Sequence, residues 1–288
     1  MPVGPPPQDE NTYILDAEST TEMARLMQQD RLITQGMGGL FPERDDVARM
    51  HHILDIACGP GGWVLDVAYA YPKLEVVGID ISHTMIEYAA ARARVQRLEN
   101  AQFQVANALK QLEFPDNFFD LVNARFIVAF MPRAAWPGLI QECMRITRPG
   151  GVIRLTDFDE PGMTNSPAFE HWKALTFHAI QKAGLAISPD GRHFGITPLL
   201  SRFLREAGCE NIDLKAYVVD FSTGTPGYEI MYQNCVVAFK QVQPLLVKMG
   251  AATQEEADEC YQQMIVEMLS NEFYALWYYL TVWGNKPE

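Results

Sequence analysis

Short apolar runs alternate with stretches of helical periodicity between residues 50 and 160. A short apolar run without polar alternation is typical of a strand that is covered on both faces, and helical periodicity between such runs predicts crossover helices. The predicted strands are His52–Ile56, Glu75–Ile79, Gln102–Val105, Phe119–Ala124 and Val152–Thr156. This order implies a parallel sheet with right-handed crossovers and helices on both faces, which is the doubly wound α/β class.

Capping and breaking residues delimit the predicted helices. Ser19 and Glu22 have the spacing of a capping box before an apolar stretch, which predicts a helix to about Asp30. Further helices are predicted over Gly62–Tyr71, over Thr84–Leu98 and from Pro132 to the Arg148-Pro-Gly-Gly151 turn.

The C-terminal part departs from this alternation. The predicted elements there are a helix over Pro198–Ala207, a strand over Ile212–Phe221, helices over Tyr228–Met249 and Thr253–Asn271, and a strand over Phe273–Trp283. The last run is apolar on both alternating faces, which predicts a strand buried on both sides. We therefore expect a mostly parallel seven-stranded sheet, an N-terminal helical segment, and two helices inserted between the last two strands.

The chain divides along the same lines. We expect a mobile, proline-rich tail over residues 1–10 and an N-terminal helical lid over residues 11–48. The core comprises residues 49–222 and 272–288, and residues 223–271 form an inserted helical cap. The cap and the lid are rich in Met, Tyr and Phe, which is typical of an enclosed pocket for a small apolar molecule. The same apolar stripe is nearly as typical of ordinary core or of a homodimer contact.

Charge and cysteine content narrow the class of protein. The 288 residues carry a formal net charge of −13 with only 23 Lys and Arg, which disfavours nucleic acid and anionic membranes as partners. The five cysteines are odd in number and widely spaced, so they predict neither a disulfide framework nor a metal site. The N-terminus lacks the pattern of a signal peptide, and the longest apolar run is too short to span a membrane. We therefore expect a cytoplasmic location.

The most informative motif is Ile53-Leu-Asp55-Ile-Ala57-Cys-Gly59-Pro-Gly61, which runs from a predicted strand through a turn of small residues into a helix. Glycine permits left-handed backbone and a close approach of a ligand, and the helix N-terminus offers free amide donors. Dinucleotides and S-adenosylmethionine both bind such turns. Ala57 replaces the first glycine of the dinucleotide pattern, and the Asp55 carboxylate repels a pyrophosphate but suits an ammonium and a sulfonium.

A second acidic residue ends the next predicted strand. Asp80 follows Val76-Val-Gly-Ile79, at the position from which a carboxylate can accept hydrogen bonds from both ribose hydroxyls of an adenosine. Either ligand contains that ribose. Asp80 therefore indicates nucleoside binding without choosing between the two.

With these motifs the chain resembles the class I S-adenosylmethionine-dependent methyltransferases, in particular the small-molecule group of ubiquinone and sterol methyltransferases. Besides the glycine loop, the matching segments are Gly78-Ile-Asp80-Ile-Ser82 with Met85, Asn107-Ala108, Pro115-Asp-Asn-Phe-Phe-Asp120 and Arg148-Pro-Gly-Gly151. The resemblance covers roughly residues 50 to 160, and it covers the flanks only through the order of elements.

This resemblance implies S-adenosylmethionine as the cofactor and S-adenosylhomocysteine as the product. The cofactor-binding residues that it implies are Asp55, Ala57, Cys58, Gly59, Gly61, Asp80, Ile81, Met85, Asn107, Ala108, Asn123 and Phe126. Asp80 would hold the ribose, and Asn107, where the family often has Asp, would face the adenine amino group. The implied cofactor set contains no metal.

The implied reaction is in-line transfer of a methyl group to an O, N or C nucleophile of a small, partly apolar metabolite. The protein then aligns the reactants, excludes water and, where the nucleophile carries a proton, supplies a base. The base candidates are His171 and His178, which share one face of a predicted helix, and Tyr13. The expected substrate contacts are Arg125, Trp172, Tyr228 and Tyr232.

Two other functions stay open at this point. A nicotinamide-dependent oxidoreductase would use the same ribose-binding acid. A non-catalytic S-adenosylmethionine-binding regulator would explain why no base stands out, since each histidine taken alone is more often a surface or hydrogen-bonded structural residue. Methylation of a base in nucleic acid is disfavoured, because Asn123-Ala-Arg-Phe126 stands where such enzymes carry an Asn-Pro-Pro-aromatic motif.

Overall fold

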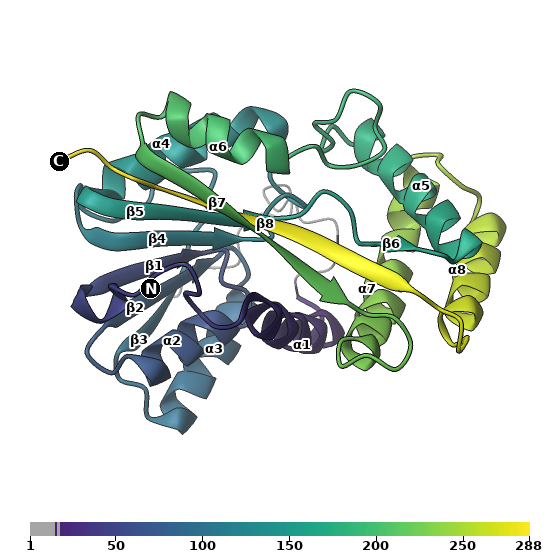
Figure 1. The fold of residues 1–288 in the computed structure, drawn as a ribbon, viewed down its shortest axis with the longest axis horizontal. Helices are drawn as coiled ribbons and strands as arrows, with labels where there is room; N and C mark the ends of the chain where they lie inside the picture. The colour runs from purple at the N-terminus through teal and green to yellow at the C-terminus, as the bar shows by residue number, and fades with distance from the viewer. Residues whose placement is uncertain (1–14, 16–17) are drawn as a thin grey trace.

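The computed structural model describes residue 15 and residues 18–288, so the predicted tail over residues 1–10 lies outside the described part. The strands are β1 His52–Ile56, β2 Glu75–Asp80, β3 Ala101–Val105, β4 Phe119–Arg125, β5 Thr147–Asp157, β6 Met163–Thr164, β7 Glu210–Asp220 and β8 Ala275–Asn285. They form one sheet in the order β3-β2-β1-β4-β5-β8-β6, with β7 paired to β8 (Figure 1). The first five strands are parallel, whereas β8 runs antiparallel to its neighbours. The predicted doubly wound fold is therefore confirmed.

Helices cover both faces of this sheet. They are α1 Thr20–Met37, α2 Gly62–Ala70, α3 His83–Gln96, α4 Trp136–Ile146, α5 Pro167–Lys182, α6 Thr197–Glu206, α7 Tyr228–Lys248 and α8 Gln254–Met268, with short 3-10 turns η2 Val47–Arg49 and η3 Arg133–Ala135. The apolar stripe of α4 that the sequence predicted, which includes Leu139, Ile140 and Cys143, is buried against the sheet together with α6. Helix α2 packs on the opposite face beside Phe41 and Val47. No helix among the described residues is both long and apolar enough to cross a membrane.

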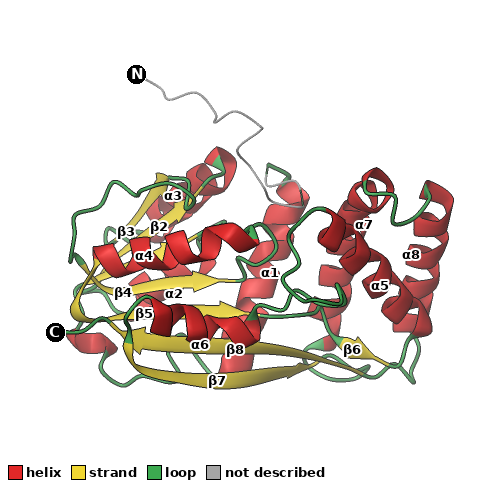
Figure 2. Cartoon of the chain, turned by 90° about the horizontal axis from the view of Figure 1, so that it is seen from above, coloured by secondary structure: helices red, strands yellow, loops and turns green. Residues whose placement is uncertain are grey.

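The predicted insertion is present, since α7 and α8 lie between β7 and β8 in the chain. They do not stand alone: α5 packs against both, and the three helices share an apolar core with α1 (Figure 2). The capping box that opens α8 is formed, because Thr253 and Glu256 each accept the other's backbone N–H. The layer beside the sheet therefore combines segments from the start, the middle and the end of the chain.

Three details differ from the expectation. The sheet has an eighth strand, β6, whose two residues are too few for a sequence pattern. Strand β8 is not buried on both sides along its whole length, because Tyr278 is 44% exposed. Helix α1 continues past Asp30 to Met37, where Gly38 ends it in the left-handed conformation. Gly36 lies within that helix because a Cβ there would come within 2.9 Å of Tyr279 and Val219, so glycine permits the close contact with the sheet.

A test of the turn between β1 and α2 follows from Gly61. Its φ is +75°, and an added Cβ would lie 2.6 Å from the Phe103 ring and 2.8 Å from Ala89. We expect Gly61→Ala to lower the free energy of unfolding by about 2–4 kcal/mol, from backbone strain and overpacking together. Urea unfolding without ligand measures this change.

The matched control is Gly138→Ala, because Gly138 lies in α4 with nothing within 4 Å of its added Cβ. That variant should be about as stable as the wild type or up to about 1 kcal/mol more stable. Equal stability of the Gly61 variant and the wild type would contradict the packing role.

Candidate functional site

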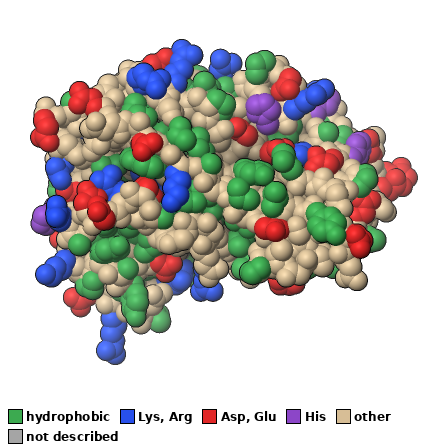
Figure 3. Space-filling view, in the orientation of Figure 1, with side chains coloured by type: hydrophobic (Ala, Val, Ile, Leu, Met, Phe, Trp, Pro, Cys, Tyr) green, Lys and Arg blue, Asp and Glu red, His purple; other side chains and the backbone are tan. Residues whose placement is uncertain are grey.

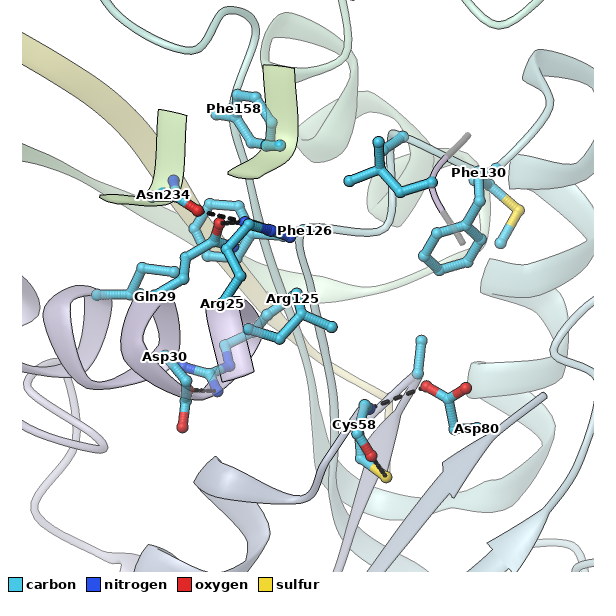
Figure 4. Close-up of a pocket in the computed structure, with 18 of the residues that line it drawn as sticks. Arg25, Gln29, Asp30, Cys58, Asp80, Arg125, Phe126, Phe130, Phe158 and Asn234 are labelled. Carbon is cyan, nitrogen blue, oxygen red and sulfur yellow. Dashed lines mark hydrogen bonds and ion pairs between the residues drawn. The ribbon is translucent and has the colours of Figure 1, made fainter. Parts of the chain in front are cut away.

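A cavity of about 270 Å³ lies at the carboxyl ends of the parallel strands. Its floor comes from the ends of β1, β2, β4 and β5, and its other walls come from α1, α5 and α7. Figure 4 shows Asp80 and Cys58 at one end, Phe158 at the other, and Arg25, Gln29 and Asn234 along one side. The cavity therefore has two parts, an end with acidic residues and an end with aromatic side chains.

The glycine loop forms the acidic end. Ala57 and Gly59 both have a positive φ, 56° and 53°, which turns the chain between β1 and α2. The loop is tied to β2 by two hydrogen bonds: Cys58 N donates to Ile79 O at 2.9 Å, and Gly59 N donates to Asp80 Oδ2 at 2.9 Å. These two hydrogen bonds hold the turn between β1 and α2 against the end of β2.

Asp80 has each carboxylate oxygen fixed by backbone. Oδ2 accepts from Gly59 N, and Oδ1 accepts from Ser82 N at 2.9 Å. Burial raises the pKa of this carboxyl above its usual range, while these hydrogen bonds act in the opposite direction. An oriented carboxylate with remaining lone pairs on the cavity wall can accept hydroxyl hydrogen bonds, as the ribose assignment requires.

Asp55 ends a chain of buried polar side chains. Asn123 Nδ2 donates to Asp55 Oδ1 at 2.7 Å, and Arg154 Nη1 donates to Asn123 Oδ1 at 2.9 Å. The Arg154 Nε in turn donates to Glu43 Oε1 at 2.5 Å, with both side chains almost fully buried. We call these four residues the Asp55 chain. It fixes one oxygen of Asp55 while the residue still lines the cavity.

Ten of the twelve predicted cofactor residues line the cavity. They are Asp55, Ala57, Cys58, Gly59, Asp80, Ile81, Met85, Asn107, Ala108 and Phe126. Gly61 is not among the lining residues, and the position that a Cβ would take there is occupied by Phe103 and Ala89. Asn123 is fully buried behind Asp55 and acts on the cavity only through that carboxylate.

Phe126 lies where the acidic end meets the aromatic end. It has a φ of +57°, a conformation that a bulky residue rarely adopts. The next turn is held by Asp157, whose Oδ2 accepts from Ile127 N at 3.1 Å and from Val128 N at 3.0 Å. The Phe126 ring lies 5.5 Å from both Phe158 and Trp277. Backbone strain at the end of β4 thus directs an aromatic ring into the cavity wall.

The aromatic end is lined by seven rings, and we call it the aromatic chamber. The rings are Phe126, Phe130, Phe158, Phe177, Phe194, Phe239 and Trp277. Two ion pairs border it. Arg25 is bound to Glu22 at 2.6 Å and also donates to Asn234 across the α1–α7 contact. Arg125 pairs with Asp30 at 2.5 Å and lies 5.4 Å from the Trp63 ring centroid.

The predicted bases are not brought to the cavity. His171 and His178 are exposed on the outer face of α5 and are absent from the lining, because the inner face of α5 carries Thr176, Phe177 and Ile180. The shared helix face was predicted correctly, but it points to solvent. Tyr13 lies outside the described residues.

Of the four predicted substrate residues, one lines the cavity and three do not. Arg125 lines the cavity. Trp172 is fully buried in the core of the helical layer, 6.0 Å from the Phe239 ring and 5.9 Å from Tyr261 between ring centroids, and does not reach the cavity. Tyr228 and Tyr232 also lie outside the lining. Their rings stack on each other, and the Tyr228 hydroxyl donates to Met268 O.

Sequence reasoning missed the residues that α1 and α7 contribute. They are Arg25, Leu26, Gln29, Asp30 and Ile33 from α1, and Met231, Asn234, Cys235, Ala238, Phe239 and Val242 from α7. The only signal for them was the spacing of Met231, Asn234 and Ala238, which puts them on one helix face. That spacing cannot tell which surface the face will meet.

A pH dependence follows from Asp55, because burial raises its pKa to about 6. Above that pH the carboxylate is charged and attracts a cationic ligand, and below it the carboxyl is neutral. We expect the affinity for S-adenosylmethionine to fall about tenfold between about pH 7 and about pH 5. Calorimetric titration across this range measures the change.

Asp55→Asn is the matched control, since it keeps the shape and removes the charge. Its affinity should be weak and nearly independent of pH over the same interval. A wild-type affinity that stays constant down to about pH 5 would contradict a direct electrostatic role for Asp55.

The chain is similar in sequence to known methyltransferases. The family model described as a methyltransferase domain matches residues 53–151. Demethylmenaquinone methyltransferase of Geobacillus kaustophilus is 26% identical over 205 residues, which cover 65% of this chain and 85% of that protein. Phosphoethanolamine N-methyltransferase 3 of Arabidopsis thaliana is 29% identical over 177 residues, which cover 58% of this chain but 35% of that protein.

Solved structures support the fold. The YcgJ protein of Bacillus subtilis superposes with a TM-score of 0.51 at 17% identity and covers 83% of this chain and 92% of its own. Phosphoethanolamine N-methyltransferase 2 of Haemonchus contortus, solved with S-adenosyl-L-methionine, gives a TM-score of 0.52 at 17% identity and covers 88% of this chain and 52% of its own. These matches extend beyond the part that the family model covers.

Proposed function

The chain belongs to the class I S-adenosylmethionine-dependent methyltransferases of the small-molecule group, and we propose that it methylates an oxygen or carbon nucleophile on a small, planar, largely apolar acceptor. One observation carries this proposal: a single cavity joins the acidic end to the aromatic chamber. Aromatic walls favour a flat apolar molecule, because ring faces and edges pack against it over a large area.

We assign the acidic end of the cavity to the cofactor and the aromatic chamber to the acceptor. The sulfonium of S-adenosylmethionine supplies an activated methyl group. Asp80 would hold the ribose, and Asp55 would attract the cationic part of the cofactor, since both carboxylates line the acidic end. Phe126, which lies between the two ends, positions the acceptor and excludes water.

The acceptor nucleophile is best supplied already ionised or as an electron-rich carbon. Among the described lining residues, Asp30 is engaged by Arg125, and Asp55 and Asp80 belong to the acidic end. Burial raises the pKa of the Cys235 thiol to about 12, so it stays protonated. An acidic phenol or enol can reach the cavity without its proton, which removes the need for a base in the chamber.

The relatives are named for two kinds of acceptor, and the chamber favours one of them. A phosphate-bearing acceptor requires cationic side chains that are not already neutralised. Here Arg25 is paired with Glu22, and Arg125 is paired with Asp30. Rings on the walls instead suit a quinone-class acceptor, the kind named in the demethylmenaquinone methyltransferases.

We also propose that residues 11–48 and 223–271 act as lid and cap over the core. Support comes from Arg25 in α1, which donates to Asn234 in α7 across 209 positions of sequence. Both residues line the cavity, so opening this contact would give the acceptor a way in. Helix α5 packs with α7 and α8 and would move with the cap.

The assay for this function measures production of S-adenosylhomocysteine from S-adenosylmethionine with 1-naphthol, naphthohydroquinone or phosphoethanolamine as acceptor. We expect turnover with the aromatic acceptors. Phe158→Ala should raise their KM about tenfold while leaving cofactor affinity unchanged, because one wall of the chamber is lost.

Phe118→Ala is the matched control, since Phe118 is partly exposed and does not line the cavity. Methylation of phosphoethanolamine alone would contradict the proposed acceptor class. Tight cofactor binding without turnover on any acceptor would instead favour the non-catalytic regulator.

We further propose that the enzyme works in the cytoplasm as a homodimer formed along β7. Among the described residues no strand pairs with the outer edge of β7. Leu214 and Val218 are 52% and 46% exposed there, and apolar side chains reach the surface on the face where β7 and β8 lie toward the viewer (Figure 3). If two copies pair antiparallel with their Leu214 residues opposite each other, Asp213 of each copy lies opposite Lys215 of the other copy.

Sedimentation velocity tests the dimer. We expect Lys215→Asp to convert dimer to monomer, because like charges would then face each other across the pair. The double variant Asp213→Lys with Lys215→Asp restores opposite charges and should restore the dimer. A monomeric wild type would contradict this proposal and leave the cavity unaffected.

A further inference from the structure

Thr176 has a buried hydroxyl for which the structure provides no hydrogen-bond partner. It lies in α5, where its neighbours Phe177 and Ile180 also line the cavity. A helical threonine commonly donates to the carbonyl one turn earlier, yet that bond is absent here. An unpaired buried hydroxyl lowers stability unless a ligand or a water molecule completes its hydrogen bonding.

The other polar groups around the chamber are mostly engaged. Arg25 binds Glu22 and donates to Asn234, and the Arg125 Nη2 donates to Asp30. The Arg125 Nε is also buried without a partner, but it belongs to a charged group that is already paired with Asp30. Among the described residues of the aromatic walls, two neutral groups are buried without a partner, the Trp277 Nε1 and the Thr176 hydroxyl. The indole N–H can only donate, so of these two groups Thr176 is the one that can both donate and accept.

We propose that Thr176 is a specificity-determining residue for the acceptor, and that the acceptor carries an oxygen, as hydroxyl, phenolate or carbonyl, that hydrogen-bonds to the Thr176 hydroxyl. This inference rests on the proposed methylation of a planar apolar acceptor and narrows its class. Seven rings bind the flat body of the acceptor without fixing its rotation in the chamber. One hydrogen bond from a known wall fixes that rotation and rejects a hydrocarbon of the same shape.

The experiment compares two probes of similar shape, 1-naphthol and 1-methylnaphthalene, which differ in having a hydroxyl or a methyl group. Their dissociation constants are measured by calorimetry or ligand-observed NMR in the presence of saturating S-adenosylhomocysteine. The readout is the ratio of the two constants, which cancels any change that affects both probes equally. We expect Thr176→Val to reduce the preference for 1-naphthol about tenfold, and Thr176→Ser to keep it.

Thr34→Val is the matched control, because Thr34 also has a buried hydroxyl without a partner but does not line the cavity. It should leave the ratio unchanged. Thr176→Ala provides a second variant should the valine side chain disturb α5, and the same loss of preference is expected.

The outcomes separate the two proposals. An unchanged ratio in the valine and alanine variants, with both probes still bound, overturns the role of Thr176 while the aromatic acceptor stands. Failure of the wild type to bind either probe, with S-adenosylhomocysteine still bound, contradicts the aromatic acceptor itself and with it this inference. A ratio that changes equally in Thr34→Val also overturns it, because the effect would then be structural.

Discussion

The buried carboxylate of Asp55 is the constraint on which the site depends. A charge at the end of a central strand is unfavourable unless it is paired or hydrogen-bonded. Here Asn123, Arg154 and Glu43 complete a continuous chain of hydrogen bonds behind it. Breaking such a buried pair typically costs about 3–5 kcal/mol, so each member restrains the others. The Asp55 chain also connects β1, β4 and β5 to the segment before β1. This connection fixes the geometry of the acidic end of the cavity.

The aromatic chamber depends on a different kind of constraint, contacts between segments distant in sequence. Phe126 is directed by strain at the end of β4 and is covered by Phe158 and Trp277, which come from after β5 and from β8. Helices α1 and α7 meet at Arg25 and Asn234 to complete the wall. The cofactor end is thus a local structure of the parallel sheet, while the acceptor end exists only when the complete chain has folded.

This difference explains what the sequence could and could not predict. Asp55 and Asp80 lie at the carboxyl ends of β1 and β2, and Gly59 follows β1. The carboxyl ends of parallel strands meet at one edge of a sheet, so the meeting of these residues was predictable. His171 was assigned correctly to a helix, but the face of that helix that turns inward depends on α7 and α8. Gly36 shows the same limit. From the sequence a glycine there suggests the end of a helix, whereas in the structure it lets the helix pack closely against Tyr279. Period and spacing determine local elements, whereas long-range packing decides which faces line the chamber.

A crystal structure with S-adenosylhomocysteine tests the central claim, that one cavity joins a cofactor end to an acceptor end, most directly. The account predicts the ribose hydroxyls on Asp80, the amino group near Asp55, and the sulfur facing Phe126 and the aromatic chamber. A ligand bound in the glycine loop with its sulfur turned away from the chamber would contradict the account, because a methyl group on that sulfur could not reach an acceptor held between the rings.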